Sequence, residues 1–202
     1  MARLMGVARL TDQNTIVPDS KYARLERERR YLLRDLPDGL TRTDPHLQIT
    51  DSYITGTRLR IRKVRDPKTN KWIVKFTQKF APNPADFSHT FITNMYLNAI
   101  EAETFGVFQA NEIRKNRYYF DFEGRRFSID MFLGDLLGLV LAEISFASDE
   151  EMAGFAQPRF ALADVTNNEV FTGGSLSELT FADIRREVAQ KGLLTNNLTN
   201  QS

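Results

Sequence analysis

The charged run YARLERERRYLL, residues 22–33, holds side chains that could bind a metal ion and a phosphate group. Five consecutive charged residues run from Glu26 to Arg30, directly before a Tyr-Leu-Leu triplet. As a helix, the run would carry an apolar stripe and a Glu26–Arg30 pair one turn apart. As a strand, it would align Glu26, Glu28 and Arg30 on one face. The local pattern favours the helix and leaves the strand open.

Two further segments, residues 52–64 and 71–80, alternate cations with large apolar residues, which is typical of half-buried strands. The cations of one parity are Arg58, Arg60 and Arg62 in the first segment and Lys75 and Lys79 in the second. Because the apolar parity needs a core, the cations would face either bulk solvent or the water-filled lumen of a closed sheet. In a lumen, they could hold a polyanion such as a polyphosphate.

Two lone carboxylates complete the set of candidate residues. Asp130 in RFSIDMF and Glu143 in VLAEISF each lie opposite apolar neighbours. Taken singly, such acids are usually surface residues. Together with Glu26 and Glu28, and with Arg117 among the cations, they could instead face one lumen. That arrangement would place a hard divalent metal, held by oxygen ligands, beside a polyphosphate clamp.

Composition limits the classes of protein that fit. The chain has 202 residues, 42% of them apolar, which suggests one globular domain with a core of its own. A net charge of +1 excludes a strongly basic nucleic-acid binder, and the absence of cysteine excludes disulfides and thiolate chemistry. His46 and His89 are too far apart for a metal or triad motif. No apolar run is long enough to span a membrane, so we expect a cytoplasmic protein.

The elements that must position these residues are mostly strands. Strands are predicted at 52–64, 71–80, 116–122, 125–132 and 138–146, with turns at 65–70 and 123–124. Helices are predicted from Ser148, over 177–192 and, with a weaker pattern, over 98–108. Residues 1–20 and 191–202 are weakly patterned and predict terminal tails. These patterns indicate an α+β domain with a largely antiparallel sheet, which could close into a barrel.

The order of these segments resembles the CYTH superfamily, the triphosphate tunnel metalloenzymes. ERERRYLL is similar to the family's E-x-E-x-K signature, with Arg30 where the family usually has lysine. ITDSYI, TRLRIRK, WIVKF and IRKNRYYF follow in the family's order, before the block FSIDMFLGDLLGLVLAEISFASDEE. The resemblance covers residues 21–176 and assigns a tunnel domain to residues 21–190.

The resemblance implies an eight-stranded antiparallel β-barrel with flanking helices, in which the run at 22–33 is a strand. It implies hydrolysis of inorganic, thiamine or nucleoside triphosphate with Mg²⁺ or Mn²⁺, and some members are class IV adenylate cyclases. The metal would be held by Glu26, Glu28, Asp130 and Glu143, with Glu28 and Arg30 as catalytic residues. The phosphates would be bound by Arg58, Arg60, Arg62, Lys75, Lys79 and Arg117. The expected partner is a triphosphate-containing small molecule, not nucleic acid or a membrane, and a homodimer stays open.

Three departures from the family pattern affect the expected chemistry. The segment SHTFITNMYLN has no acid where the family has paired glutamates, and its polar residues include Thr93 and Asn94. Ser145 and Ser128 stand where the family has, or often has, further acids. Fewer carboxylates would bind a divalent metal less tightly, or bind only one. The alternatives are therefore a polyphosphate- or nucleotide-binding module with weak or no turnover, and an adenylate cyclase.

Overall fold

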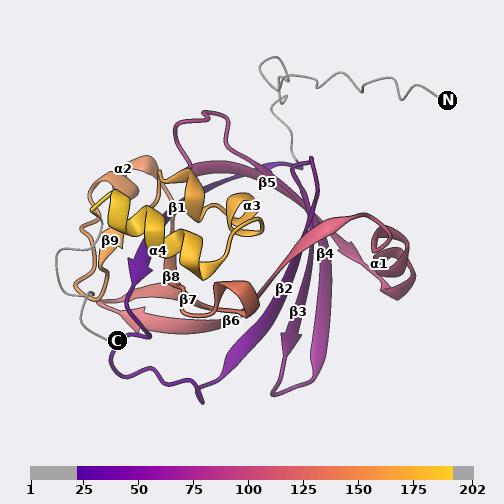
Figure 1. Cartoon of the computed structure of the whole chain (residues 1–202), viewed down its shortest axis with the longest axis horizontal. Helices are drawn as coiled ribbons and strands as arrows, with labels where there is room; N and C mark the ends of the chain where they lie inside the picture. The colour runs from indigo at the N-terminus through magenta and orange to yellow at the C-terminus, as the bar shows by residue number, and fades with distance from the viewer. Residues whose placement is uncertain (1–21, 193–202) are drawn as a thin grey trace.

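The computed structural model describes residues 22–192, so the predicted tail at 1–20 and residues 193–202 lie outside the described residues. Within this range the chain forms eight long strands (Figure 1). Their bounds are β1 Arg24–Leu33, β2 His46–Ile54, β3 Leu59–Asp66, β4 Lys71–Phe80, β5 His89–Leu97, β6 Ala110–Phe122, β7 Arg125–Leu133 and β8 Val140–Phe146.

The sheet closes into a barrel because both of its ends pair with each other. The strand order is β5-β4-β3-β2-β6-β7-β8-β1, and β1 also pairs with β5. Every pairing around the barrel is antiparallel. A short ninth strand, β9 (Ala163–Asp164), pairs with β1 at Tyr31 and Leu32. The predicted antiparallel eight-stranded barrel with flanking helices is therefore confirmed.

Long-range pairing makes the charged run 22–33 a strand. Arg24 to Arg27 pair with β5, and Arg27 to Leu33 pair with β8. Together these two ladders pair every residue of β1 with a neighbouring strand, which outweighs the local preference for a helix. The alternation of a strand then directs Glu26, Glu28 and Arg30 to the lumen, as the strand prediction required.

The structure corrects the predicted strand at 52–64. Residues 55–58 form a turn in which Gly56 has a φ of 72°, a conformation that glycine adopts without steric cost. The segment therefore belongs to two strands, the end of β2 and most of β3, which form a hairpin. The turn predicted at 65–70 covers only residues 67–70, because Arg65 and Asp66 still belong to β3. The predicted turn at 123–124 is confirmed, and Glu123 and Gly124 both have positive φ, as a tight hairpin turn needs.

The helices are short and are formed by segments between and after the strands. They are α1 Ala99–Phe105, α2 Asp149–Ala153, α3 Gly173–Leu176 and α4 Phe181–Gln190, with 3₁₀ turns η2 at Gly134–Leu136 and η3 at Glu169–Phe171. The helix predicted over 177–192 begins only at Phe181, because Thr180 and Asp183 form a capping box there. Among residues 22–192, no helix has the length and apolar composition that a membrane span requires.

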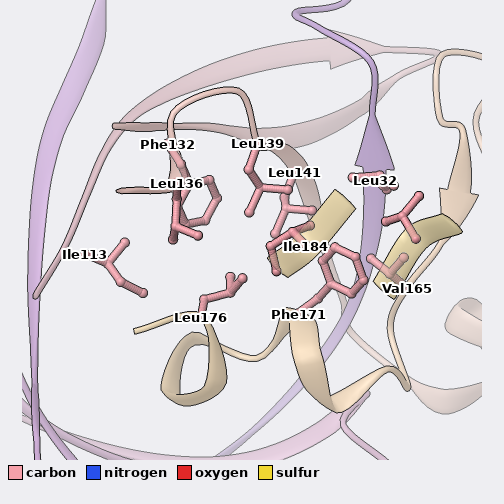
Figure 2. Packing of buried hydrophobic residues seen from close by; sticks show 11 residues of the cluster. Leu32, Ile113, Phe132, Leu136, Leu139, Leu141, Val165, Phe171, Leu176 and Ile184 are labelled. Atoms are coloured by element: carbon pink, nitrogen blue, oxygen red, sulfur yellow. The ribbon is translucent and has the colours of Figure 1, made fainter. Parts of the chain in front are cut away.

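An inner apolar cluster fills part of the barrel and fixes the C-terminal helices against it. It consists of Leu32, Ile113, Phe132, Leu136, Leu139, Leu141, Val165, Phe171, Leu176, Ile184 and Val188. Figure 2 shows Phe171, Leu176 and Ile184 meeting the strand residues of this cluster. Because burying each such side chain contributes about 1.5–3 kcal/mol, the cluster anchors η3, α3 and α4 beside the lumen.

A second, outer apolar cluster covers the opposite face of the same strands. It consists of Tyr31, Leu33, Tyr118, Phe127, Ile129, Val140, Ala142, Ile144, Phe146 and Met152. Its strand residues have the parity opposite to that of the lumen, and Met152 of α2 packs on them. The wall made by β1, β6, β7 and β8 is thus packed on both faces, which gives the charged lumen residues a rigid support.

Candidate active site

The lumen contains a cavity of about 450 Å³, and 13 of its 30 lining residues are charged. Its cations are Arg24, Arg30, Arg58, Arg60, Arg62, Lys75, Lys79, Lys115 and Arg117, and its carboxylates are Glu26, Glu28, Asp51 and Glu143. Nine cations against four carboxylates leave an excess of five positive charges in a protein whose net charge is +1. The cavity is therefore a local concentration of positive charge in a nearly neutral protein.

The structure brings together all but one of the residues predicted for the site. Only Asp130 does not line the cavity. Its side chain is 1% exposed and lies behind the lining, where it accepts hydrogen bonds from two of the cations. Lys115 Nζ donates to Asp130 Oδ2 at 2.5 Å, and Arg117 donates to both carboxylate oxygens at 2.6 Å. Asp130 thus holds two lining cations in place.

Acidic side chains gather on β1 and β8. Lys79 Nζ donates to Glu28 Oε2 at 2.8 Å and to Glu26 Oε2 at 3.2 Å. Glu143 lies across the ladder from Arg30 and accepts from Arg30 Nε at 3.2 Å and from Arg117 Nη2 at 2.7 Å. Burial alone would raise the pKa of Glu143, but the neighbouring guanidiniums, Arg117 first, hold it well below its usual value.

A buried acid that the sequence analysis missed holds the arginines of β3. Asp51 on β2 is 1% exposed and accepts two hydrogen bonds of 2.6 Å from Arg62. Burial would raise the pKa of Asp51, but Arg60 and Arg62 outweigh burial and lower it. Arg60 Nε lies 3.6 Å from Asp51 and has no hydrogen-bond partner within the described residues, although the atom is buried. A buried donor without a partner is what an anionic ligand would satisfy.

The β5 wall of the cavity is neutral, as the sequence predicted for this segment. It contributes Thr90, Ile92 and Asn94. Thr77 of β4 donates to Asn94 Oδ1 at 2.7 Å, and the buried hydroxyl of Thr90 has no hydrogen-bond partner among residues 22–192. The cavity therefore has an acidic wall on β1 and β8 and a neutral wall beside it.

Two lumen arginines contact the segment of η3 and α3, Arg30 directly and Arg60 through Tyr53 of β2. Arg30 Nη1 donates to the carbonyl oxygen of Phe171 at 2.9 Å, and Arg60 Nη1 donates to Tyr53 Oη at 3.3 Å. Gly173 packs directly on Tyr53, since a Cβ atom at Gly173 would lie 1.8 Å from the Tyr53 hydroxyl oxygen. This close approach requires glycine.

We expect Gly173→Ala to lower the free energy of unfolding by about 1–3 kcal/mol, because an added methyl group must displace Tyr53 or α3. The adjacent Gly174 supplies the matched control, since a Cβ there meets no atom within 4 Å. Thermal or urea unfolding of both variants measures the effect. Equal stabilities of Gly173→Ala and Gly174→Ala would contradict the packing described.

Parity within the strands could have revealed the missed residues. Asp51 has the same parity as Tyr53 on β2, and Lys115 lies two residues before Arg117 on β6, so each shares a face with a lining residue. Arg24 likewise precedes Glu26 by two residues. Each missed residue therefore obeys the alternation that identified the others.

The donor chemistry of the acidic wall fits a hard divalent cation. Glu26, Glu28 and Glu143 offer carboxylate oxygens from neighbouring strands, the ligands that Mg²⁺ and Mn²⁺ prefer. A cation, the ammonium of Lys79, already lies between two of these carboxylates. Each of the three is ion-paired, and within residues 22–192 no group of three acids or histidines is already arranged as a metal site.

Comparison found solved structures that are similar to this chain, whereas no family model and no curated protein matches the sequence. One structure of the protein NE1496 has a TM-score of 0.52 at 19% identity, over 77% of this chain and 99% of that one. Another, of NE1496 as an inorganic triphosphatase, has a TM-score of 0.51 at 18% identity, over 75% and 93%. HpAC1 from Hippeastrum, described with a dominant triphosphatase activity, has a TM-score of 0.43 at 11% identity, over 86% and 92%.

Proposed function

Because the chain has the triphosphate tunnel fold of the CYTH-type proteins, we propose that it hydrolyses a triphosphate in its lumen with a divalent cation, Mg²⁺ or Mn²⁺. The observation that carries this proposal is the excess of positive charge around a cavity of about 450 Å³, which is five among the lining residues and four when the buried Asp130 behind them is counted. Triphosphate carries about four negative charges near neutral pH, so a cavity with this excess can compensate for its lost hydration. The similarity to a fold in which NE1496 is an inorganic triphosphatase supports the same substrate class.

In this proposal the cations bind and orient the phosphates. Asp51 accepts from Nε and Nη2 of Arg62 and lies beside Arg60, and Asp130 holds Lys115 and Arg117 in a similar way. Each guanidinium carries five N–H donors, so the donors that these acids do not use can bind phosphate oxygens. Because their partners fix them before a ligand arrives, little side-chain entropy is lost on binding. Lys75 and Lys79 add point charges from β4.

The acidic wall supplies the ligands for the divalent cation. Glu26, Glu28 and Glu143 would hold it, and Arg30 keeps Glu143 in place through its 3.2 Å hydrogen bond. A bound divalent cation neutralises charge on the transferred phosphoryl group and can activate a water molecule. The protein's own contribution is to align the triphosphate between this wall and the arginines of β3 and β6.

Phosphate release tests the proposal directly. Purified protein with Mg²⁺ or Mn²⁺ should release orthophosphate from tripolyphosphate, thiamine triphosphate or a nucleoside triphosphate, and chelation of the metal should stop the release. No release from this panel with either metal would refute hydrolysis. Formation of cyclic AMP from ATP without orthophosphate would identify a cyclase instead.

A second candidate, a polyphosphate- or nucleotide-binding module without turnover, is favoured by a specific observation. The lumen carboxylates Glu26, Glu28 and Glu143 are all ion-paired, and β5 adds no acid to the cavity. A site of this kind would bind the anion through its arginines and release no product. Stabilisation by tripolyphosphate in EDTA, combined with no phosphate release in Mn²⁺, would identify it.

Both candidates predict that Arg60 is needed for binding. We expect Arg60→Ala to weaken tripolyphosphate binding by about 10- to 100-fold, because a charge-assisted hydrogen bond contributes about 1.5–3 kcal/mol. Calorimetric titration in EDTA measures the change. Lys63→Ala is the control, since Lys63 lies on the same strand, is exposed and does not line the cavity. Equal affinities of Arg60→Ala and Lys63→Ala for tripolyphosphate would mean that the anion does not bind at Arg60.

A further inference from the structure

The ammonium group of Lys79 occupies the space between the two carboxylates of β1. Its Nζ lies 2.8 Å from Glu28 Oε2 and 3.2 Å from Glu26 Oε2. Lys79 comes from β4, which is separated from β1 by β5, so its side chain must reach across the neutral residue Ile92. A long flexible lysine stem allows this reach, and the three side chains are between 15% and 29% exposed.

The third acid of this wall, Glu143, has other partners. Glu143 pairs with Arg30 at 3.2 Å and with Arg117 at 2.7 Å. The ammonium group of Lys79 therefore contacts two of the three carboxylates to which the proposed function assigns the divalent cation.

The neutral wall of β5 offers a divalent cation no further charged ligand. Thr90 is the cross-strand partner of Glu26, and Asn94 lies further along the same face of β5. Neither can supply a charged ligand. A divalent cation at the acidic wall therefore depends on Glu26, Glu28 and Glu143, and it must compete with Lys79 for the oxygens of the first two.

We propose that Lys79 competes with the divalent cation for Glu26 and Glu28. The ammonium group of Lys79 leaves these two carboxylates when a bound triphosphate offers it another partner. This inference rests on the proposed function, because it uses the same cation and substrate. Two positive charges cannot be held closely by the same carboxylate oxygens without strong repulsion. Metal binding to the free protein should therefore be weak, and the triphosphate should strengthen it.

Linkage makes the coupling reciprocal. If the triphosphate draws Lys79 away from the glutamates and so favours the metal, the bound metal must favour the triphosphate by the same factor. Such couplings typically change an affinity by about 5- to 150-fold. The consequence is that cation and substrate load together, and the free protein does not accumulate metal.

Lys75 provides a matched control for Lys79. Both are lysines of β4 with lumen parity, and both line the cavity. Lys75 Nζ instead lies 5.4 Å from the centre of the Tyr96 ring. Because the two lysines are four residues apart along the strand, about 13 Å, a change at Lys75 removes the same charge from the cavity without freeing Glu26 and Glu28.

The test is a titration of the full chain with Mn²⁺ in the absence of triphosphate, read by calorimetry. We expect Lys79→Met to bind Mn²⁺ about tenfold more tightly than the wild type, and Lys75→Met to bind it as the wild type does. Lys79→Gln serves as a second uncharged variant, and thermal unfolding checks that each variant is folded. In EDTA, both lysine variants should bind tripolyphosphate more weakly than the wild type.

An unchanged or weaker Mn²⁺ affinity of both Lys79 variants would overturn the inference, as would the absence of Mn²⁺ binding to every variant. An equal gain in Lys75→Met would also overturn it, since the effect would then be one of overall charge. Failure of the proposed function has a different signature, namely no phosphate release by the wild type. The two outcomes are independent because Mn²⁺ affinity is measured without turnover.

Discussion

Replacing Asp130 by alanine is expected to lower the free energy of unfolding by about 3–5 kcal/mol, because it removes the anion that pairs with the buried Lys115 and the partly buried Arg117. Asp130 is 1% exposed, and its oxygens accept hydrogen bonds of 2.5–2.6 Å from Lys115 and Arg117. Arg117 keeps Glu143 as a partner, so Lys115 is the cation that loses most. Urea unfolding measures the change, and Asp130→Asn, which keeps the shape of the side chain, should show a smaller loss of the same sign.

A control for this prediction lies on the same hairpin. Asp121 of β6 and Arg126 of β7 form two hydrogen bonds of 2.9 Å, which resemble the Asp130–Arg117 pair, but both side chains are about two-thirds exposed. Exposed pairs contribute little to stability, so Asp121→Ala should leave the unfolding curve nearly unchanged. If Asp130→Ala lowered the free energy of unfolding by no more than Asp121→Ala does, the buried ion pairs of Asp130 would not stabilise the fold.

Alternation along strands made most of the site predictable from the sequence. The lumen parity of Arg60 and Arg62, of Lys75 and Lys79, and of Glu143 follows from their apolar neighbours, which had to face away from the lumen. Period-two patterning specifies a face strongly wherever the other face is buried. The same rule would have found Asp51 and Lys115, which lie on lumen faces of strands that the sequence indicated less clearly.

The predictions that failed or stayed ambiguous depend on contacts that a local pattern does not contain. Residues 22–33 favour a helix locally, and only their ladders with β5 and β8 make them a strand. The turn at Gly56 was hidden because the residues around it continue the strand-like composition. Parity also could not show that Asp130 lies behind the cavity lining, since this depends on how Lys115 and Arg117 converge on it.

Glu28→Ala is expected to abolish phosphate release while leaving tripolyphosphate binding intact. Glu28 faces the lumen beside Lys79, and its carboxylate would hold the divalent cation in the proposed function. Without it, the acidic wall keeps Glu26 and Glu143, which are too few to hold the cation where β5 offers no further acid. Phosphate release with Mg²⁺ and Mn²⁺ measures turnover, and titration in EDTA measures binding of the anion.

The direction of the binding effect separates this variant from Arg60→Ala. Removing a carboxylate raises the positive excess of the cavity, so Glu28→Ala should bind tripolyphosphate in EDTA as tightly as the wild type or more tightly. Glu112→Ala, at an exposed residue of β6 that does not line the cavity, controls for the loss of an acid elsewhere on the barrel. Wild-type turnover by Glu28→Ala would show that the acidic wall is not needed for phosphate release. Loss of anion binding together with turnover would mean that Glu28 supports the cavity's shape, because a group that repels the substrate cannot contribute to its affinity directly.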